Sequence, residues 1–245
     1  MGNTAAMFTM ETDVVAGRGT GSSRLPLLLQ LVSPTLPVGA YAYSQGLEQA
    51  VEWGWVIDER SAHDWITGVL LSSLMTLDVP VLQRLALAWE QSDYAALCRW
   101  NAFLLACRET SELRAEDRNL GQALRRLLPA LDVQGLAELQ REHATLTPCY
   151  ALGFTCVGSH WQIDIRTLAT GYCWSWVENQ VMAALKLMSL GQTAGQRMLL
   201  SLGRLIDEQI DTALALSDDH ITSSLPGFAM ASAAHEIQFS RLFRS

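Results

Sequence analysis

Two apolar stripes with helical spacing, joined by a very short break, lie in the last third of the chain. The first stripe consists of Trp174, Val177, Val181, Leu185 and Met188, and the second of Leu199, Leu202, Ile206 and Ile210. Apolar residues that recur every three or four positions share one face of an α-helix. Leu190-Gly191 interrupts the pattern, and Thr193 with Gln196 has the spacing of a capping box that starts a new helix. The segment is therefore predicted to form a hairpin of two helices.

The same spacing occurs earlier in the chain. One stripe consists of Leu97, Trp100, Leu104 and Cys107, and another of Leu113, Leu120, Leu124 and Leu127. Ser61 with Asp64 has the form of an acidic capping box, and Pro80 is typical of the first turn of a further helix. Alternation with a period of two residues hardly occurs, so a sheet is not expected. We predict an all-α, single-domain helical bundle over residues 25–245, after a Gly-, Ser- and Thr-rich leader (residues 1–24) predicted to be disordered.

Charge and hydropathy exclude several classes of protein. The net charge of −8 argues against nonspecific attraction to nucleic acid or to an anionic membrane. No uncharged run has the length and apolarity of a spanning helix, and the best candidate, residues 144–163, contains Pro148 and His160. The first residues lack the apolar core of a secretory signal. We therefore expect a cytoplasmic protein.

The cysteines predict neither disulfides nor a metal site. There are five of them at scattered positions, with no CxxC pair and no histidine at ligand spacing. We expect no stable metal site made by the protein alone and no tightly bound cofactor.

Two motifs have a superficial likeness to catalytic sites. A P-loop requires Ser or Thr after its lysine, but Lys186, the single lysine, is followed by Leu187. The segment Ala42–Gly46 resembles a degraded nucleophile elbow around Ser44, yet the strand that such an elbow needs is missing. In the alternative interpretation Ser44 lies near a helix start, with Glu48 in its first turn, and both satisfy free N–H groups. We expect no enzyme, and a serine hydrolase using Ser44 is a remote alternative.

The last eleven residues, His235 to Ser245, combine aromatic side chains with arginines. Ile237, Phe239, Leu242 and Phe243 supply apolar contacts, and Arg241 and Arg244 supply forked donors. This mixture is enriched in the hot spots of protein interfaces. We interpret the segment as a docking tail; the alternative is a tail that packs back on its own domain.

Four separated motifs occur at residues 28–48 (LLQLVSPTLPVGAYAYSQGLE), 178–186 (ENQVMAALK), 190–197 (LGQTAGQR) and 235–244 (HEIQFSRLFR). In content and in order they resemble the motifs of the urease accessory protein family UreF, and the resemblance spans about residues 25–245. One departure is Ser189, where the family pattern leads us to expect a proline.

The resemblance implies an all-helical, non-enzymatic factor for urease maturation by nickel insertion. UreF-like proteins dimerise, bind UreD (called UreH in some organisms), recruit the GTPase UreG and then meet apo-urease. The tail, which in that family becomes ordered on meeting UreD, implies docking roles for His235, Glu236, Phe239, Ser240, Arg241, Leu242, Phe243 and Arg244. The first motif implies a UreG-facing surface that comprises Pro37, Gly39, Tyr41, Ser44, Gln45, Gly46 and Glu48.

Lys186 and Asn179 lie on one helix face offset from the apolar stripe. The resemblance implies that this face contacts a partner and affects the fidelity of metal insertion, whereas the alternative is an ordinary solvated lysine. The family is also linked to a transient passage for nickel and to modulation of GTP hydrolysis. No residue pattern identifies which side chains line such a passage; His220 is only a candidate. A self-sufficient nickel metallochaperone is a further alternative.

Overall fold

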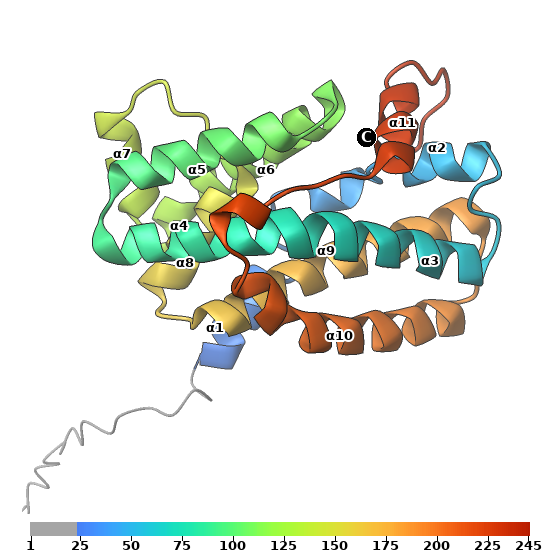
Figure 1. The fold of residues 1–245 in the computed structure, drawn as a ribbon, viewed down its shortest axis with the longest axis horizontal. Helices are drawn as coiled ribbons and strands as arrows, with labels where there is room; N and C mark the ends of the chain where they lie inside the picture. Colours follow the sequence, from blue (N-terminus) through green and yellow to red (C-terminus); the bar gives the residue numbers. More distant parts are fainter. Residues whose placement is uncertain (1–23) are drawn as a thin grey trace, which may run out of the picture.

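The computed structural model describes residues 24–245, and within this range it contains helices and no strand. The predicted leader, apart from Arg24, lies outside the described residues. The all-α, single-domain prediction is confirmed. Figure 1 shows the long helices lying across one another, with the C-terminal segment beside the short helix α2.

The first half of the chain is built around one long helix. The chain begins with α1 (Leu25–Leu31), the short 3-10 helix η2 (Ala40–Ala42) and α2 (Leu47–Glu52). Then α3 (Glu59–Val69), the π-helical segment η3 (Leu70–Asp78) and α4 (Val79–Gln91) run on without a break. α4 begins at Val79 and has Pro80 in its first turn, as predicted, although the π-helical turns of η3 lead into it without a break.

The remaining helices pack around this long helix and around α9. They are α5 (Tyr94–Cys107), α6 (Ser111–Leu127), the 3-10 helix η4 (Leu128–Leu131), α7 (Gly135–Glu142), α8 (Tyr150–His160), α9 (Ile165–Met188), α10 (Gln192–Leu214), η5 (Asp218–His220) and α11 (Pro226–His235). α8 lies against α4 and α6, while α9 lies against α10 and α2. The predicted stripes of α5, α6, α9 and α10 contribute most of their members to the core. Periodicity thus located these helices correctly.

Two predicted helix starts are wrong at the level of the cap. α3 is capped by Asp58, whose carboxylate accepts the Ser61 N–H at 2.8 Å, so Ser61 is the third residue of the helix and not its cap. α10 begins at Gln192 after Gly191, and no side chain caps it. In both cases a better-placed residue upstream already satisfies the geometry, because a capping residue must leave the helical conformation while its neighbours keep it.

The turn between α9 and α10 explains the serine at position 189. Ser189 ends α9 in the left-handed conformation, with φ of 52°. A proline ring locks φ near −65°, so proline is incompatible with this turn. The predicted helical hairpin is present, with a turn of a kind that proline cannot form.

The helix Glu59–Gln91 also bears on the membrane prediction. It is 33 residues long, and by length and composition alone it is apolar enough to cross a membrane, with 67% of its apolar window buried inside the fold. This helix contains Asp64, Asp78 and Arg84, so no uncharged run marks it in the sequence. A buried core helix meets the same criteria, and the other helices cover this one.

Candidate partner-binding site

Residues from three distant motifs meet at one place. The Asn179 side chain on α9 donates to the Tyr43 carbonyl at 3.0 Å. The Arg244 N–H in the tail donates to the Ala42 carbonyl at 2.7 Å. The Lys186 Nζ lies 5.7 Å from the centre of the Phe243 ring, within the range of a cation–π contact. The loop before α2, the C-terminal half of α9 and the tail therefore form one continuous site.

The loop before α2 binds the last residue of the tail through its main chain. The N–H groups of Ser44 and Gln45 donate to the Ser245 main-chain oxygen at 2.5 and 2.9 Å, and the Ser44 hydroxyl donates to the same oxygen at 2.7 Å. Gln45 and Gly46 have positive φ values of 53° and 78°. This conformation turns successive N–H groups toward one point, which makes a concave site for an oxygen with partial or full negative charge.

Gly46 also permits close packing. A Cβ built on it would lie 2.9 Å from the Ser232 nitrogen in α11, a distance that real Cβ atoms essentially never show. By contrast, Gly39 has φ of 83° and open space around its missing Cβ. Gly46 therefore serves the contact between α2 and α11, whereas Gly39 serves only the turn.

Glu48 is buried beneath the tail, with 7% of its surface exposed. Its two carboxylate oxygens accept the Leu242 N–H at 2.6 Å and the Phe243 N–H at 2.9 Å. Its Oε2 also lies 3.2 Å from the His235 Nε2. One carboxylate thus contacts both the end of α11 and the last residues of the tail.

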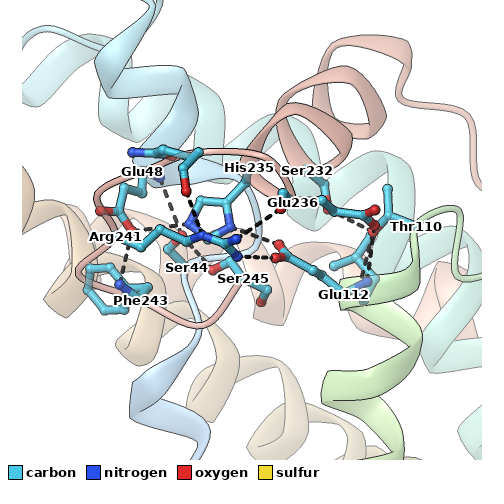
Figure 2. A network of polar contacts seen from close by, with 12 residues as sticks. Ser44, Glu48, Thr110, Glu112, Ser232, His235, Glu236, Arg241, Phe243 and Ser245 are labelled. Atoms are coloured by element: carbon cyan, nitrogen blue, oxygen red, sulfur yellow. Dashed lines mark hydrogen bonds and ion pairs between the residues drawn. The ribbon is translucent and has the colours of Figure 1, made fainter.

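Glu112, at the start of α6, binds the same histidine from its other side. Its Oε2 lies 2.7 Å from the His235 Nδ1, and its Oε1 accepts Arg241 Nη1 at 2.7 Å. The two ring nitrogens of His235 therefore each face one carboxylate. We call Glu48, Glu112, His235 and Arg241 the tail cluster; Figure 2 shows it between α2, α6 and the tail.

Glu236 fixes the end of α11 to the start of α6. Its carboxylate accepts the Ser111 N–H at 2.9 Å and the Ser111 hydroxyl at 2.7 Å. These hydrogen bonds, the side-chain bond from Ser111 first, lower the pKa of Glu236. Beside it the hydroxyls of Thr110 and Ser232 are 2.8 Å apart (Figure 2). A carboxylate at a helix N-terminus satisfies N–H groups that lack helical partners.

The predicted site residues divide into buried and exposed groups. Ser44, Gly46, Glu48, His235 and Phe243 are buried, and Gly39, Gln45, Asn179 and Glu236 are partly buried. The exposed predicted residues are Pro37, Tyr41, Lys186, Phe239, Ser240, Arg241, Leu242 and Arg244. The buried group holds the site together, and only the exposed group is available to a partner in this structure.

One part of the tail packs on its own domain, and another part is exposed. Its last residues pack on their own domain, with Phe243 at 6% and Ser245 at 1% exposure. Its middle does not, because Phe239 is fully exposed, and Ile237 and Leu242 are 87% and 64% exposed. The tail is therefore bound at both ends and presents apolar side chains between them. Its docking role toward UreD stays a prediction.

A second group of buried charges lies deeper in the bundle. Arg108 donates to Asp78 at 2.5 and 3.1 Å and to Asp117 at 2.8 Å, and the Tyr172 hydroxyl donates to Asp78 at 3.1 Å. Burial opposes the charge of Arg108, but Asp78 and Asp117 outweigh it and raise the pKa of Arg108 above its usual range. We call these four residues the core cluster. Local sequence patterns gave no signal for it, because its members are charged or polar residues from four separate segments.

Glu116 on α6 lies between the two clusters. It accepts the Gln45 side-chain N–H at 2.7 Å and the Ser245 hydroxyl at 3.0 Å. Burial raises its pKa to about 7 despite these two hydrogen bonds. Sequence analysis missed Glu116, since one glutamate among the polar residues of α6 has no distinguishing feature.

A cavity of about 380 Å³ lies next to the loop before α2. Its walls are mostly apolar, and they include Tyr41, Gln45, Asn179 and Lys186 from the predicted site. Its charged lining residues are Asp78, Arg108, Glu109, Glu116, Asp117, Glu178 and Lys186. The cavity therefore joins the predicted partner face to the core cluster.

The alternative interpretations of the sequence concern a metal site, His220 and a serine hydrolase that uses Ser44. Within residues 24–245, no group of three or more His, Cys, Asp or Glu side chains is arranged to hold a metal ion. His220 is exposed, and its Nδ1 lies 2.7 Å from the Ser217 hydroxyl. Ser44 lies near the start of α2 and its hydroxyl accepts the Glu48 N–H at 3.3 Å, as the alternative interpretation expects. Because Ser44 is fully buried, its hydroxyl has no open approach for a substrate.

Comparison with known proteins decides the family. The family model named UreF matches residues 56–203, which is more than half of the chain. The chain belongs to the UreF family. Three relatives, each called urease accessory protein UreF, come from Alkalilimnicola ehrlichii, Pseudoalteromonas translucida and Hahella chejuensis. They are 49%, 47% and 45% identical over 89%, 92% and 89% of this chain and over 94%, 97% and 96% of their own lengths. The UreF resemblance of the four sequence motifs is thereby confirmed.

Proposed function

We propose that this chain is a non-enzymatic scaffold for urease maturation by nickel insertion. In this proposal it binds UreD through its tail, recruits UreG through the face that carries Tyr41 and Lys186, and brings both to apo-urease in the cytoplasm. Membership of the UreF family supports the role in urease maturation. The partners are those that the UreF resemblance implies, and their surfaces are inferred from the tail and its surroundings.

One observation carries the proposal. Phe239 is fully exposed, and Ile237 and Leu242 lie mostly exposed on either side of it. Large apolar side chains that lie together on the solvent-exposed surface of a protein mark interaction sites, and aromatic side chains are enriched among the residues that contribute most of the binding energy there. Three large apolar side chains exposed in one short segment therefore favour a binding role for that segment.

The scaffold acts by proximity. If UreG, UreD and apo-urease are bound together, transfer of nickel becomes effectively intramolecular, and loss of the ion to solvent is reduced. The cavity beside Tyr41 and Lys186 supports a transient passage for nickel, because carboxylates of Glu109, Glu116 and Glu178 are among its lining residues. Dimerisation and modulation of GTP hydrolysis by UreG complete the proposal.

A single substitution tests the tail better than truncation does. Removing residues 239–245 also removes Phe243 and Ser245 from the core, so unfolding and loss of docking would be confused. The Phe239 side chain is fully exposed, so Phe239→Ala is expected to keep the thermal midpoint and to abolish co-purification with UreD. Leu200→Ala, at a 60% exposed position on α10, is the matched control. Full retention of UreD by Phe239→Ala would overturn docking through the tail.

The face toward UreG is tested at Tyr41, which is 66% exposed. Tyr41→Ala and Lys186→Ala are expected to keep UreD binding and to weaken recruitment of UreG and nickel-dependent urease activity. GTP hydrolysis by UreG, measured with and without each variant, tests the modulation. Unchanged recruitment by both variants would remove this face from the proposal.

The self-sufficient metallochaperone is distinguished by the isolated protein. Equilibrium dialysis with nickel alone is expected to give no sub-micromolar binding. Tight binding without UreG would favour the metallochaperone over the scaffold.

A further inference from the structure

The loop before α2 is bound from two sides, by side chains of α6 and of α9. The Gln45 side chain donates from Nε2 to Glu116 on α6 at 2.7 Å. Its Oε1 accepts the indole N–H of Trp176 on α9, also at 2.7 Å. An indole N–H can only donate, so the Gln45 amide is oriented with its oxygen toward Trp176 and its nitrogen toward Glu116. One side chain of the loop therefore connects two helices.

Tyr43, two positions earlier, is bound by the same two helices. Its hydroxyl accepts from the Asn119 side chain on α6 at 3.3 Å, and its carbonyl accepts from the Asn179 side chain on α9 at 3.0 Å. Glu116 and Asn119 are three positions apart, as are Trp176 and Asn179, so each pair lies on one face of its helix. We call these two pairs the loop-binding residues. None of their contacts with Tyr43 and Gln45 involves the tail.

The two tyrosines of the loop face opposite environments. Tyr43 is bound between the helices and has 5% of its surface exposed, whereas Tyr41 has 66% exposed. Tyr41 lies in the short helix η2, where the N–H groups of Ala42 and Tyr43 donate to the Gly39 and Ala40 carbonyls at 3.1 and 3.2 Å. The turn that carries the exposed tyrosine therefore ends at a residue that α6 and α9 both bind.

We propose that the loop-binding residues are positioning residues that place the loop before α2 so that Tyr41 is presented to UreG. This inference rests on the proposed recruitment of UreG through this face. A surface loop that is bound to the body of the protein loses less conformational entropy when a partner contacts it, and the gain appears as affinity. Asn179, for which the family resemblance implies a face that contacts a partner, acts on that partner through the loop.

The test compares Trp176→Phe with Trp89→Phe. Each substitution removes an indole N–H and retains an aromatic ring, but Trp89 on α4 donates to the Leu152 carbonyl and the Thr155 hydroxyl, at 3.3 and 3.2 Å, away from the loop. Complexes of each variant with UreD are titrated with UreG. The dissociation constant for UreG is expected to rise about fivefold for Trp176→Phe, the scale of one hydrogen bond, and to stay unchanged for Trp89→Phe.

Two further measurements separate positioning from general destabilisation. Amide hydrogen exchange within η2 is expected to accelerate in Trp176→Phe and in Asn179→Ala, but not in Trp89→Phe. In a double-mutant cycle, Trp176→Phe is expected to cost less affinity for UreG in the Tyr41→Ala background than in the unchanged chain, because the position of the loop matters less once its exposed tyrosine is gone.

Glu116 offers a rescue by a conservative substitution. Glu116→Gln keeps an oxygen that can accept from Gln45, whereas Glu116→Leu does not. Affinity for UreG is therefore expected to be kept by Glu116→Gln and weakened by Glu116→Leu. Equal affinities of these two variants would contradict a positioning role for this hydrogen bond.

The outcomes distinguish this inference from the function on which it rests. Faster exchange within η2 with unchanged affinity for UreG, or effects of Trp176→Phe and Tyr41→Ala that simply add, would overturn the positioning role while leaving recruitment through this face intact. If Tyr41→Ala and Lys186→Ala both leave the affinity for UreG unchanged, the proposed recruitment through this face fails and the positioning role fails with it.

Discussion

The core cluster and the tail cluster are both networks in which carboxylates bind an arginine, but they connect different parts of the molecule. Arg108 joins Asp78 in the long central helix to Asp117 in α6, so every member belongs to the bundle. His235 and Arg241 in the tail cluster join the bundle to a segment whose middle remains exposed. The same chemistry therefore serves the fold in one place and presentation of a surface in the other. The difference predicts distinct responses to substitution.

The largest effect is expected for Arg108→Met. Loss of the guanidinium leaves Asp78 and Asp117 buried without a cation, which costs about 3–5 kcal/mol in comparable buried pairs. Urea unfolding of the variant measures this loss directly. A change below about 1 kcal/mol would mean that the core cluster does not support the bundle and would erase the contrast with the tail cluster.

Glu116, between the clusters, is expected to make stability depend on pH. Its pKa of about 7 in the folded protein lies above the usual 4.5, so the folded state retains a proton that the unfolded state releases. Its stabilising contribution is complete below about pH 4.5 and is lost as the pH rises through about 7, a span worth about 3 kcal/mol.

Glu116→Gln removes this titration. The free energy of unfolding of the variant minus that of the unchanged chain is expected to be larger at pH 8 than at pH 5, as measured by urea unfolding at the two values. An identical difference at both would show that burial does not perturb Glu116.

Gly46→Ala tests how much the close contact between the start of α2 and α11 contributes to stability. A methyl group there meets the Ser232 nitrogen at 2.9 Å and also takes a φ of 78°, so we expect a loss of about 1–3 kcal/mol. Gly39→Ala shares the positive φ but has open space, and about 1 kcal/mol is expected. Thermal unfolding of the pair gives the difference, and equal losses would show that contact with α11 is unimportant.

The smallest effect is expected for Glu236→Ala, which removes the carboxylate from the N-terminus of α6. Thr110 still caps α6 in this variant, and loss of the hydrogen bonds from Ser111 costs about 1 kcal/mol. Hydrogen exchange at the Ser111 and Glu112 amides should accelerate while the core amides of α9 stay protected. Uniform acceleration along the chain would indicate that the tail cluster and the core cluster unfold as one unit.

Sequence patterns predicted the helices well because each stripe reports its own buried face. The stripe from Trp174 to Met188 lies within α9, and the stripe from Leu97 to Cys107 lies within α5. Helix starts were less accurate, since Asp58 and Ser61 both suit a cap by residue type and only the backbone conformation decides between them. Pro80 correctly marked the first turn of α4, whereas the π-helical turns of η3 before it had no signal in the sequence.

The site was predicted in part. The motifs around Tyr41, Lys186 and Phe243 do meet in space, yet the sequence offered no reason for Phe243 to be buried while Phe239 is exposed. Phe243 is bound through its N–H to Glu48, which lies 195 positions before it. Contacts over such separations follow from the fold, and Glu112 and Glu116 were missed for the same reason.

Lys186 is the sole lysine in the sequence, and its ammonium group lies over the Phe243 ring. Apart from the α-amino group, an amine-reactive fluorophore therefore has one attachment point, next to the buried end of the tail. Because the dye would share its surroundings with that aromatic ring, its emission and its accessibility to quenchers would follow release and rebinding of the tail in real time, without any engineered residue.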